Sequence, residues 1–242
     1  MLVEFPERPR AGSDTGSAPL AEASASRVSD PGLVVAVIPA HDEQARIGKA
    51  IRSLDEQSSP PDLTIVCADN CTDRTAIAAE AAGADVIVTE GNEHGRAGAV
   101  NQALELLLPC LRDDDAVLVM DPSSFLAPRF ISEARRLLQE GAGGVGGIFT
   151  GLESSSIVRL LHGTEYERFA RVYSMLGANQ LVASGKATLF STQALSHVLI
   201  ARAAGLLPGG ERDDVYDVRA ESPDVELSLA LLHLGYKVIA SR

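Results

Sequence analysis

Strand and helix patterns alternate along the chain from Leu33 onward. The continuous β-branched run Leu33–Ile38 is typical of a strand covered on both faces. Ile47, Ala50, Ile51 and Leu54 then recur at helical spacing. Further strands are predicted at Leu63–Cys67, Val86–Val88 and Ala116–Met120, and helices at Thr72–Ala82 (capped by Thr72, stopped by Gly83), Ala97–Leu108 and Pro128 to about Gly141. This alternation predicts an α/β fold with a mostly parallel central sheet flanked by helices.

Polar residues follow each of the four predicted strands. In such sheets ligands bind beyond the carboxyl ends of the strands, so these positions are candidate site residues. They are His41, Asp42 and Glu43, then Asp69 and Asn70, then His94 and Arg96, and finally Asp121. Asp42 also suits a cap of the helix entered at Glu43, and Asp73 also suits a helix dipole.

The second half of the chain predicts more helices and one more glycine-containing strand. Residues 154–176 form an amphipathic helical pattern, 182–190 a strand, Thr192–Ala204 a packing helix, and Gly209–Glu221 a polar mobile loop. Gly185 marks either a close approach to a ligand or a bulge. A last helix is predicted to begin at Pro223. Its Asp224 and Glu226 are either functional residues of the site or only complement the helix dipole.

Domain organisation follows from a change in composition near residue 32. Residues 1–31 are rich in Ser, Ala, Pro and Gly and lack periodicity, which predicts a disordered arm. Residues 32–242 suit a single domain, divided into two halves, 32–125 and 126–242.

Charge and hydropathy exclude several classes of protein. The formal net charge of −12 argues against a nucleic-acid partner, since such binding needs a basic surface. No apolar run approaches the roughly 20 residues that span a bilayer, and the first thirty residues lack a signal-peptide core. The three cysteines cannot all pair, which favours structural thiols in a reducing, cytoplasmic compartment.

Several motifs together resemble one family of enzymes. They are Val37-Ile38-Pro39-Ala40-His41-Asp42-Glu43, Ala68-Asp69-Asn70-Cys71-Thr72-Asp73-Arg74-Thr75, Gly95-Arg96-Ala97-Gly98-Ala99-Val100-Asn101, the turn at Asp121, and the helix start at Asp224 followed by Gly235-Tyr236-Lys237. In order and spacing they resemble the inverting glycosyltransferases of family 2, which have the GT-A fold. The resemblance covers about Leu33 to Lys237, and it implies that 32–125 is the nucleotide-binding half and 126–242 the acceptor half.

The resemblance implies a role for each matching residue. Asp224 would be the general base, and Gly185 and Glu226 would lie near the sugar and acceptor. Asp69 would accept a hydrogen bond from the imide nitrogen of uracil. The residues implied in nucleotide binding are Pro39, Ala40, Glu43, Asp69, Arg96, Gly98 and Asp121.

The implied metal motif departs from the family pattern. An Asp-any-Asp turn holds Mg²⁺ or Mn²⁺ in the family, whereas this chain has Asp121-Pro122-Ser123, so Ser123 replaces a carboxylate ligand. Weak metal affinity, metal-poor binding and an inactive relative all stay open. Pro223 likewise replaces the usual Glu before the base. Asp113-Asp114-Asp115 also matches Asp-any-Asp but precedes its strand, which predicts a solvated turn.

The predicted function is transfer of one sugar from a nucleotide-diphosphate sugar, UDP-linked in the first instance, to an unidentified acceptor hydroxyl. One alternative is a sugar-nucleotide-binding protein with little or no turnover. A sugar-phosphate nucleotidyltransferase is a second alternative, although its Gly-rich phosphate loop is absent after Ile38. Gly141–Gly146 satisfies the dinucleotide fingerprint by composition, but it closes a helix and enters a strand predicted over Val145–Phe149, which indicates a glycine-rich connection.

Overall fold

Seven strands form one mixed sheet in the computed structural model, which describes residues 32–147, 185–207 and 214–241. Across the sheet the strands follow the order β3-β2-β1-β4-β6-β5-β7. Their bounds are β1 Val34–Ala40, β2 Leu63–Ala68, β3 Asp85–Val88, β4 Ala116–Met120, β5 Ala142–Gly147, β6 Ala187–Ser191 and β7 Lys237–Ser241. The predicted α/β class is confirmed, while the predicted arm 1–31 and helix 154–176 lie outside the described residues.

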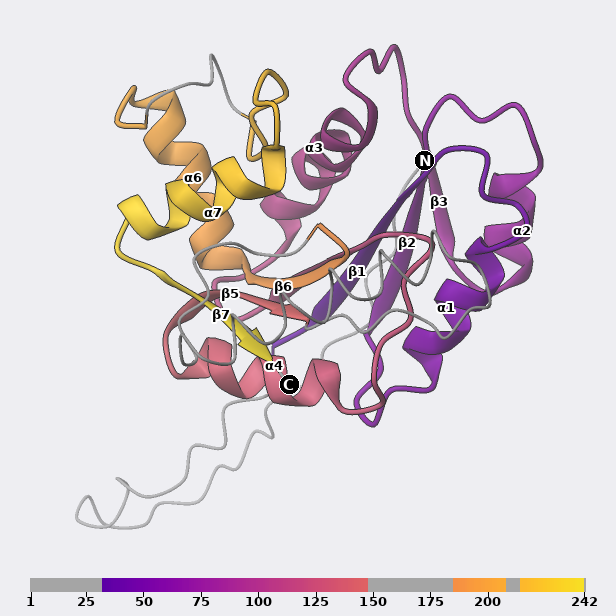
Figure 1. The fold of residues 1–242 in the computed structure, drawn as a ribbon, viewed down its shortest axis with the longest axis horizontal. Helices are drawn as coiled ribbons and strands as arrows, with labels where there is room; N and C mark the ends of the chain where they lie inside the picture. The colour runs from indigo at the N-terminus through magenta and orange to yellow at the C-terminus, as the bar shows by residue number, and fades with distance from the viewer. Residues whose placement is uncertain (1–31, 148–184, 208–213, 242) are drawn as a thin grey trace, which may run out of the picture.

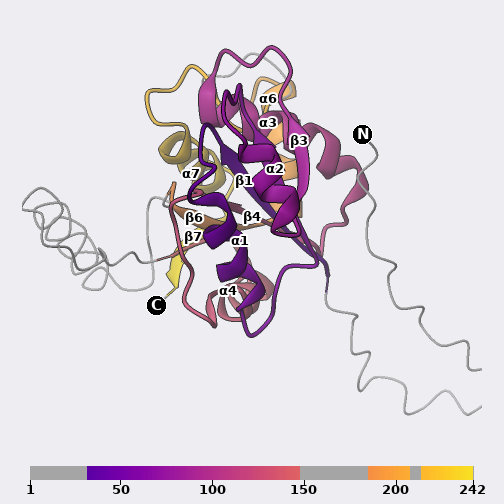
Figure 2. The ribbon, with the colours of Figure 1, turned by 90° about the vertical axis from the view of Figure 1, so that its right-hand side faces the viewer.

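Helices cover both faces of the sheet (Figure 1, Figure 2). On one face lie α1 (Ile47–Asp55), α2 (Thr75–Ala81) and α4 (Phe130–Gln139), and on the other α3 (Gly95–Leu107), α6 (Thr192–Ala203) and α7 (Pro223–His233), with a short 3₁₀ helix at Leu108–Cys110. Alternate residues of β1 enter the two cores, which explains its continuous apolar run. None of the described helices is long and apolar enough to cross a membrane.

Two helix starts differ from their predictions. The second helix begins at Thr75, and Thr72 does not cap it because the Thr72 hydroxyl donates to the Asp42 carboxylate. The fourth begins at Phe130, so Pro128 lies before the helix instead of in its first turn. Both helices end where glycine adopts a left-handed conformation, at Gly83 (φ 94°) and Gly141 (φ 95°), as the sequence indicates.

The strand predicted from Val145 is present as β5, but it already begins at Ala142, so the prediction of the glycine-rich run as a connection is wrong. Gly143 and Gly144 belong to β5, between β6 and β7. A Cβ on Gly143 would lie 2.7 Å from the Tyr236 Cβ, and one on Gly144 would lie 3.1 Å from a ring carbon of Phe190. Glycine here makes room for neighbouring side chains.

The loop predicted over 209–221 is not polar throughout. Residues 208–213 lie outside the described residues, but Val215 and Tyr216 are buried. The Asn101 side chain donates to the Tyr216 carbonyl at 2.8 Å and accepts from its N–H at 2.9 Å. This amide ties the segment to α3 and into the core.

The strand directions bring several chain segments to one edge of the sheet. β1 runs parallel to β2 and β4, and β2 runs parallel to β3, so their carboxyl ends lie together. β6 is antiparallel to β4, with Met120 opposite Ala187, so β6 begins where β4 ends. Residues that follow β1, β2 and β4 therefore meet those that precede β6.

Candidate active site

A buried carboxylate with one open oxygen lies at the end of β2. Asp69 Oδ1 accepts hydrogen bonds from Asn92 (2.7 Å), Thr89 (2.8 Å) and Asn70 (3.1 Å). The Asp69 N–H donates to the Ala40 carbonyl at 2.8 Å, which fixes it against β1. Oδ2 has no hydrogen-bond donor among the described residues. The carboxylate is therefore rigid and presents one acceptor to a ligand.

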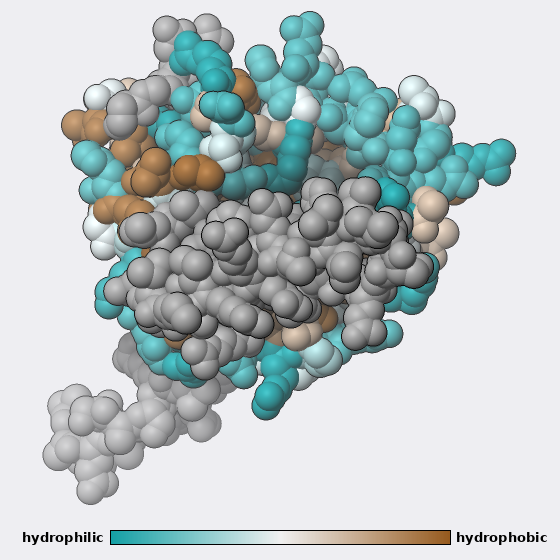
Figure 3. Space-filling view, in the orientation of Figure 1, coloured by the Kyte–Doolittle hydropathy of each residue, from teal (hydrophilic) through white to brown (hydrophobic). Residues whose placement is uncertain are grey.

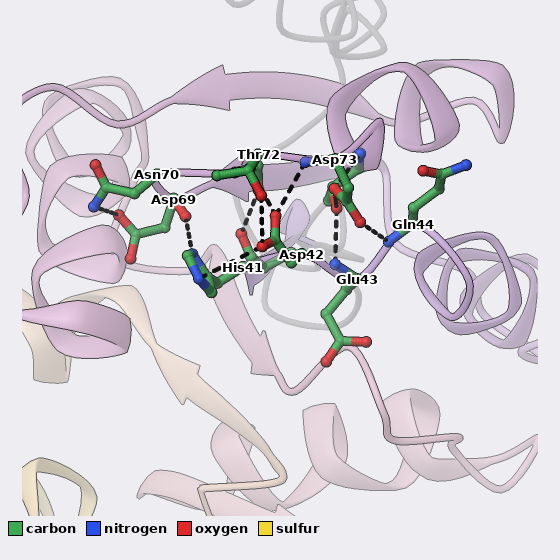
Figure 4. A network of polar contacts seen from close by, with 11 residues as sticks. His41, Asp42, Glu43, Gln44, Asp69, Asn70, Thr72 and Asp73 are labelled. Atoms are coloured by element: carbon green, nitrogen blue, oxygen red, sulfur yellow. Dashed lines mark hydrogen bonds and ion pairs between the residues drawn. The ribbon is translucent and has the colours of Figure 1, made fainter.

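The loops after β1 and β2 are held together by two further carboxylates (Figure 4). Asp42, with φ 51°, accepts from the Thr72 N–H (2.7 Å) and hydroxyl (2.9 Å) and from the Asp73 N–H (3.1 Å). Asp73 accepts from the N–H of Gln44 at 3.0 Å and of Thr75 at 2.8 Å. Asp42 therefore clamps two loops, and the helix-cap interpretation is wrong because α1 begins only at Ile47.

The predicted nucleotide residues of β1 belong to this same pair of loops. Pro39 and Ala40 are the last, buried residues of β1. The Glu43 N–H donates to the Thr75 hydroxyl at 2.8 Å, and its carboxylate pairs with Arg46 at 3.1 Å. His41 Nδ1 lies 2.7 Å from the Asp69 carbonyl oxygen. The two loops thus form one continuous wall beside Asp69.

Gly98 lies near the Asp69 site for a reason that the sequence does not reveal. It is buried in α3, and a Cβ there would lie 2.0 Å from Asn92 Oδ1. Because Asn92 also donates to Asp69, a larger residue at 98 would disturb the partner of this carboxylate. Its small size makes room for a side chain of the protein.

Two predicted residues from distant segments, Arg96 and Gly185, meet at Asp224. Arg96, in the first turn of α3, donates from Nη1 to both Asp224 oxygens at 2.8 and 3.0 Å. Its Nη2 donates to the Gly185 carbonyl at 2.9 Å. A Cβ on Gly185 would lie 2.5 Å from Asp224 Oδ2, so glycine is required for this approach and does not mark a bulge. The tip of Asp224, in the first turn of α7, is thereby fixed.

Asp121 lies beside Lys186, a residue that the sequence did not single out. The Asp121 N–H donates to the Lys186 carbonyl at 2.8 Å, and Lys186 Nζ lies 3.2 Å from Asp121 Oδ2. Oδ1 accepts from the N–H of Ser123 at 2.8 Å and from its hydroxyl. Burial acts to raise the pKa of Asp121, but the Ser123 hydrogen bonds and the Lys186 charge outweigh it and hold that pKa below its ordinary value.

These four charged residues are called the charged centre below: Asp121, Lys186, Arg96 and Asp224. Gly185 and Lys186 are adjacent in the chain, and the first touches Asp224 and Arg96 while the second touches Asp121. One short segment before β6 therefore links the carboxylate that follows β4 to the carboxylate that opens α7.

Glu226 faces a different partner. Its carboxylate forms an ion pair with Arg202 of α6, whose side chain is fully buried. Arg202 also donates to the Val215 carbonyl at 3.2 Å. The pair joins α7 to α6 and to the buried segment at 215, so Glu226 holds the helix that carries Asp224.

The side-chain oxygens of Asp121 and Ser123 are ligands of the kind that suits a hard divalent cation. The Asp121 carboxylate and the Ser123 hydroxyl lie side by side, with one negative charge fewer than two carboxylates would supply. Elsewhere in the described part of the chain, ligand atoms of Asp42, Cys71 and Asp73 lie within 4.8 Å of one another. Those two carboxylates already accept the hydrogen bonds that join the loops.

The acidic triplet before β4 is not uniformly solvated. Asp113 and Asp114 are exposed, but Asp115 is buried. Its two oxygens accept from the Leu33 and Arg112 N–H groups, each at 2.7 Å. The prediction of a solvated turn is therefore wrong for Asp115, which fixes the amino ends of β1 and β4.

The surface around the loops is mainly hydrophilic in the view of Figure 3, and apolar side chains gather over α6 and α7. Large apolar residues exposed on or next to these helices are Ile200, Leu206 and Leu229. The loop side, with its carboxylates and cations, is thus the polar part of the molecule and suits a charged ligand.

Several solved structures are similar to this chain. A mannosyltransferase from Pyrobaculum calidifontis, in complex with GDP-Man and Mn²⁺, shares 17% identity over 88% of this chain and 55% of its own, with a TM-score of 0.63. Glucosyl-3-phosphoglycerate synthase from Mycobacterium tuberculosis, with Mn²⁺, UDP and phosphoglyceric acid, shares 21% identity over 86% of this chain and 68% of its own, with a TM-score of 0.51. S. aureus TarS shares 15% identity over 87% and 35%, with a TM-score of 0.57.

These likenesses show the GT-A fold, and this chain spans just over half the length of the mannosyltransferase. A search of curated protein sequences found no match. The family model described as "Glycosyltransferase like family 2" matches residues 31–226, which is most of the chain. The chain therefore belongs to the glycosyltransferase-like family 2.

Proposed function

We propose that this chain transfers a single sugar from a UDP-sugar to an acceptor hydroxyl with inversion at the anomeric carbon. The observation that carries the proposal is the charged centre. It joins Asp121, which follows β4 on the nucleotide side, to Asp224 on the acceptor side through Gly185 and Lys186. An inverting transfer needs a base on one side of the sugar and a charged group for the leaving diphosphate on the other.

The donor nucleotide would bind between the loops after β1 and β2. Oδ2 of Asp69 would accept the imide N–H of uracil, since a carboxylate oxygen is an acceptor and Oδ1 is already occupied. Pro39, Ala40 and Glu43 would line the same wall, with Gly98 behind it. The mycobacterial synthase is in complex with UDP and the mannosyltransferase with GDP-Man. The choice of uracil as the base therefore belongs to this proposal and does not follow from these structures.

In the transfer itself, Asp224 would act as the general base. The acceptor oxygen forms a bond to the anomeric carbon while the bond from that carbon to the diphosphate oxygen breaks, and the acceptor proton passes to the Asp224 carboxylate. Arg96 now donates to Asp224, and the same guanidinium can donate to a phosphate oxygen when the nucleotide is present. Gly185 leaves room for Asp224 beside the sugar.

Asp121 and Ser123 would hold a Mg²⁺ or Mn²⁺ ion. Two of the similar structures contain Mn²⁺, and the Asp121 and Ser123 oxygens are ligands of the kind such ions prefer. When bound, the ion would supply positive charge that stabilises the leaving diphosphate.

Calorimetry with UDP-sugars, combined with a donor-hydrolysis assay, tests the proposal. We expect Asp224→Asn to bind the donor as the wild type does and to lose about 100-fold or more in turnover, since a general base contributes about 10²–10⁴-fold. Asp113→Asn is the matched control, because it removes an exposed carboxylate that precedes β4, at the end of this strand opposite to Asp121.

Two results would contradict the proposal. Donor binding without turnover in both the wild type and Asp224→Asn would identify a sugar-nucleotide-binding protein instead. No binding of any nucleotide sugar would remove the donor assignment altogether.

A further inference from the structure

Lys186 is a cation held at the end of β4 by its own backbone. Its carbonyl accepts from the Asp121 N–H at 2.8 Å, in continuation of the antiparallel register that pairs Met120 with Ala187. Its Nζ lies 3.2 Å from Asp121 Oδ2, and its side chain is 39% exposed. The ammonium group thus lies beside the carboxylate proposed to hold the metal and stays accessible to a ligand.

The turn Asp121-Pro122-Ser123 carries less negative charge than an Asp-any-Asp turn. The turn here has one carboxylate, because Ser123 supplies a neutral hydroxyl. Within the charged centre, Asp121 and Asp224 contribute two negative charges and Lys186 and Arg96 contribute two positive charges. The protein therefore neutralises its own carboxylates, and a diphosphate meets no net negative charge from these four groups.

We propose that Lys186 is a binding residue for the diphosphate, and that it lets the chain bind nucleoside diphosphates without a divalent metal. An ammonium group has three donors on a flexible stem, so it can turn from Asp121 toward phosphate oxygens over a short path. A metal at Asp121 would then strengthen binding instead of being required for it. This inference rests on the proposed donor class.

A simple ion pair is the competing explanation of the contact. Partly exposed pairs such as Lys186 with Asp121 contribute little to stability. In that case replacing Lys186 would leave nucleotide affinity unchanged, which separates the two explanations by measurement.

Calorimetry with UDP as the probe, in EDTA and in Mn²⁺, provides the test. We expect the wild type in EDTA to bind UDP within about tenfold of its affinity in Mn²⁺. Lys186→Ala should lose about 10- to 100-fold in EDTA, the range for a charge-assisted hydrogen bond, and clearly less in Mn²⁺. Lys186→Arg should keep most of the EDTA affinity, which also shows that the site tolerates substitution.

Two further variants control for charge. Lys49→Ala removes an exposed cation from α1 and should not change UDP affinity in either condition. Ser123→Asp restores a second carboxylate, so it should weaken UDP binding in EDTA and strengthen it in Mn²⁺.

Equal EDTA affinities of Lys186→Ala and wild type would overturn the inference. It would equally fail if wild-type UDP binding were measurable only in Mn²⁺, although the proposed function would survive that result. Absence of UDP binding in both conditions would instead remove the proposed donor and this inference with it.

Discussion

Carboxylates lie at both ends of the parallel strands, and their partners differ. At the amino ends, Asp115 accepts from the backbone N–H groups of Leu33 and Arg112, and Asp62 accepts from that of Val34 at 2.7 Å. At the carboxyl ends, Asp69 and Asp224 accept chiefly from side chains.

The difference separates structural carboxylates from those available to a ligand. A backbone N–H that bonds Asp115 cannot leave without moving a strand, and an unpaired buried N–H carries a large desolvation cost. A side chain such as Arg96 can rotate toward a phosphate while the backbone stays in place. The type of partner, more than the residue type, indicates which aspartates can bind substrate.

The largest expected effect comes from filling the space beside Asp224. Gly185→Ala places a Cβ 2.5 Å from Asp224 Oδ2, closer than atoms can approach, so the carboxylate must move away from its Arg96 contacts. A displacement of about 1 Å in a catalytic group costs about 100-fold. We expect turnover to fall by about this factor with UDP affinity nearly unchanged, as measured by initial rates and calorimetry.

Gly48→Ala is the matched control for this substitution. The atom nearest to a Cβ at 48 is an Arg52 side-chain nitrogen at 3.5 Å, so alanine fits in α1 without displacement. It should leave turnover unchanged and stabilise the fold by about 0.5–1 kcal/mol, because glycine in a helix has the greater conformational entropy to lose. Wild-type turnover in Gly185→Ala would show that Asp224 is not the base.

Replacing the structural carboxylate should affect stability and leave binding intact. Asp115→Ala removes the acceptor of two N–H groups, one of them in a buried hydrogen bond, and should lower the free energy of unfolding by about 1–3 kcal/mol. Urea unfolding measures the loss, and calorimetry below the transition should show wild-type UDP affinity. A selective loss of UDP affinity in a fully folded Asp115→Ala would break the distinction between the two ends.

Asp69→Asn should have the opposite signature. The amide oxygen can take the Oδ1 position and keep the Asn92, Thr89 and Asn70 hydrogen bonds, while the amide NH₂ takes the Oδ2 position. A donor would then face the imide N–H of uracil, so UDP affinity should fall by about tenfold or more with the unfolding midpoint retained. Unchanged UDP affinity would exclude Asp69 as the uracil acceptor.

Local patterns were enough to predict the strand ends, and hence the places of Asp69 and Asp121, because strands and turns are encoded in short runs of residues. Asp224 was predicted at a helix start, from the resemblance to the family. The Asp121–Lys186 contact joins residues 65 positions apart through an antiparallel register, which a single sequence does not encode locally. Gly98 likewise looks like a ligand contact until Asn92 is seen beside it. Contacts between residues far apart in the chain are therefore the part of this site that the sequence alone did not predict.

Asp42 tests the role of the partner type by the smallest expected effect. It follows the carboxyl end of β1, but it accepts hydrogen bonds from backbone N–H groups. Hydrogen bonds from the Thr72 N–H, then the Thr72 hydroxyl, lower the pKa of Asp42 below its ordinary value of 3.8. A depressed folded-state pKa gives stability that is present above the unfolded pKa and is lost as pH falls through the folded one. Asp42→Asn keeps an acceptor and tolerates the φ of 51°, but it cannot titrate. Its urea midpoint should therefore lie slightly below that of the wild type at pH values above 3.8, and the gap should close as pH falls through the lowered folded-state pKa. Because the group is exposed, the shift should be the smallest of the series, and UDP affinity should change little. A gap that does not narrow as pH falls below 3.8 would mean that the Thr72 hydrogen bonds do not stabilise the Asp42 carboxylate, and that position at the sheet edge matters more than the type of partner.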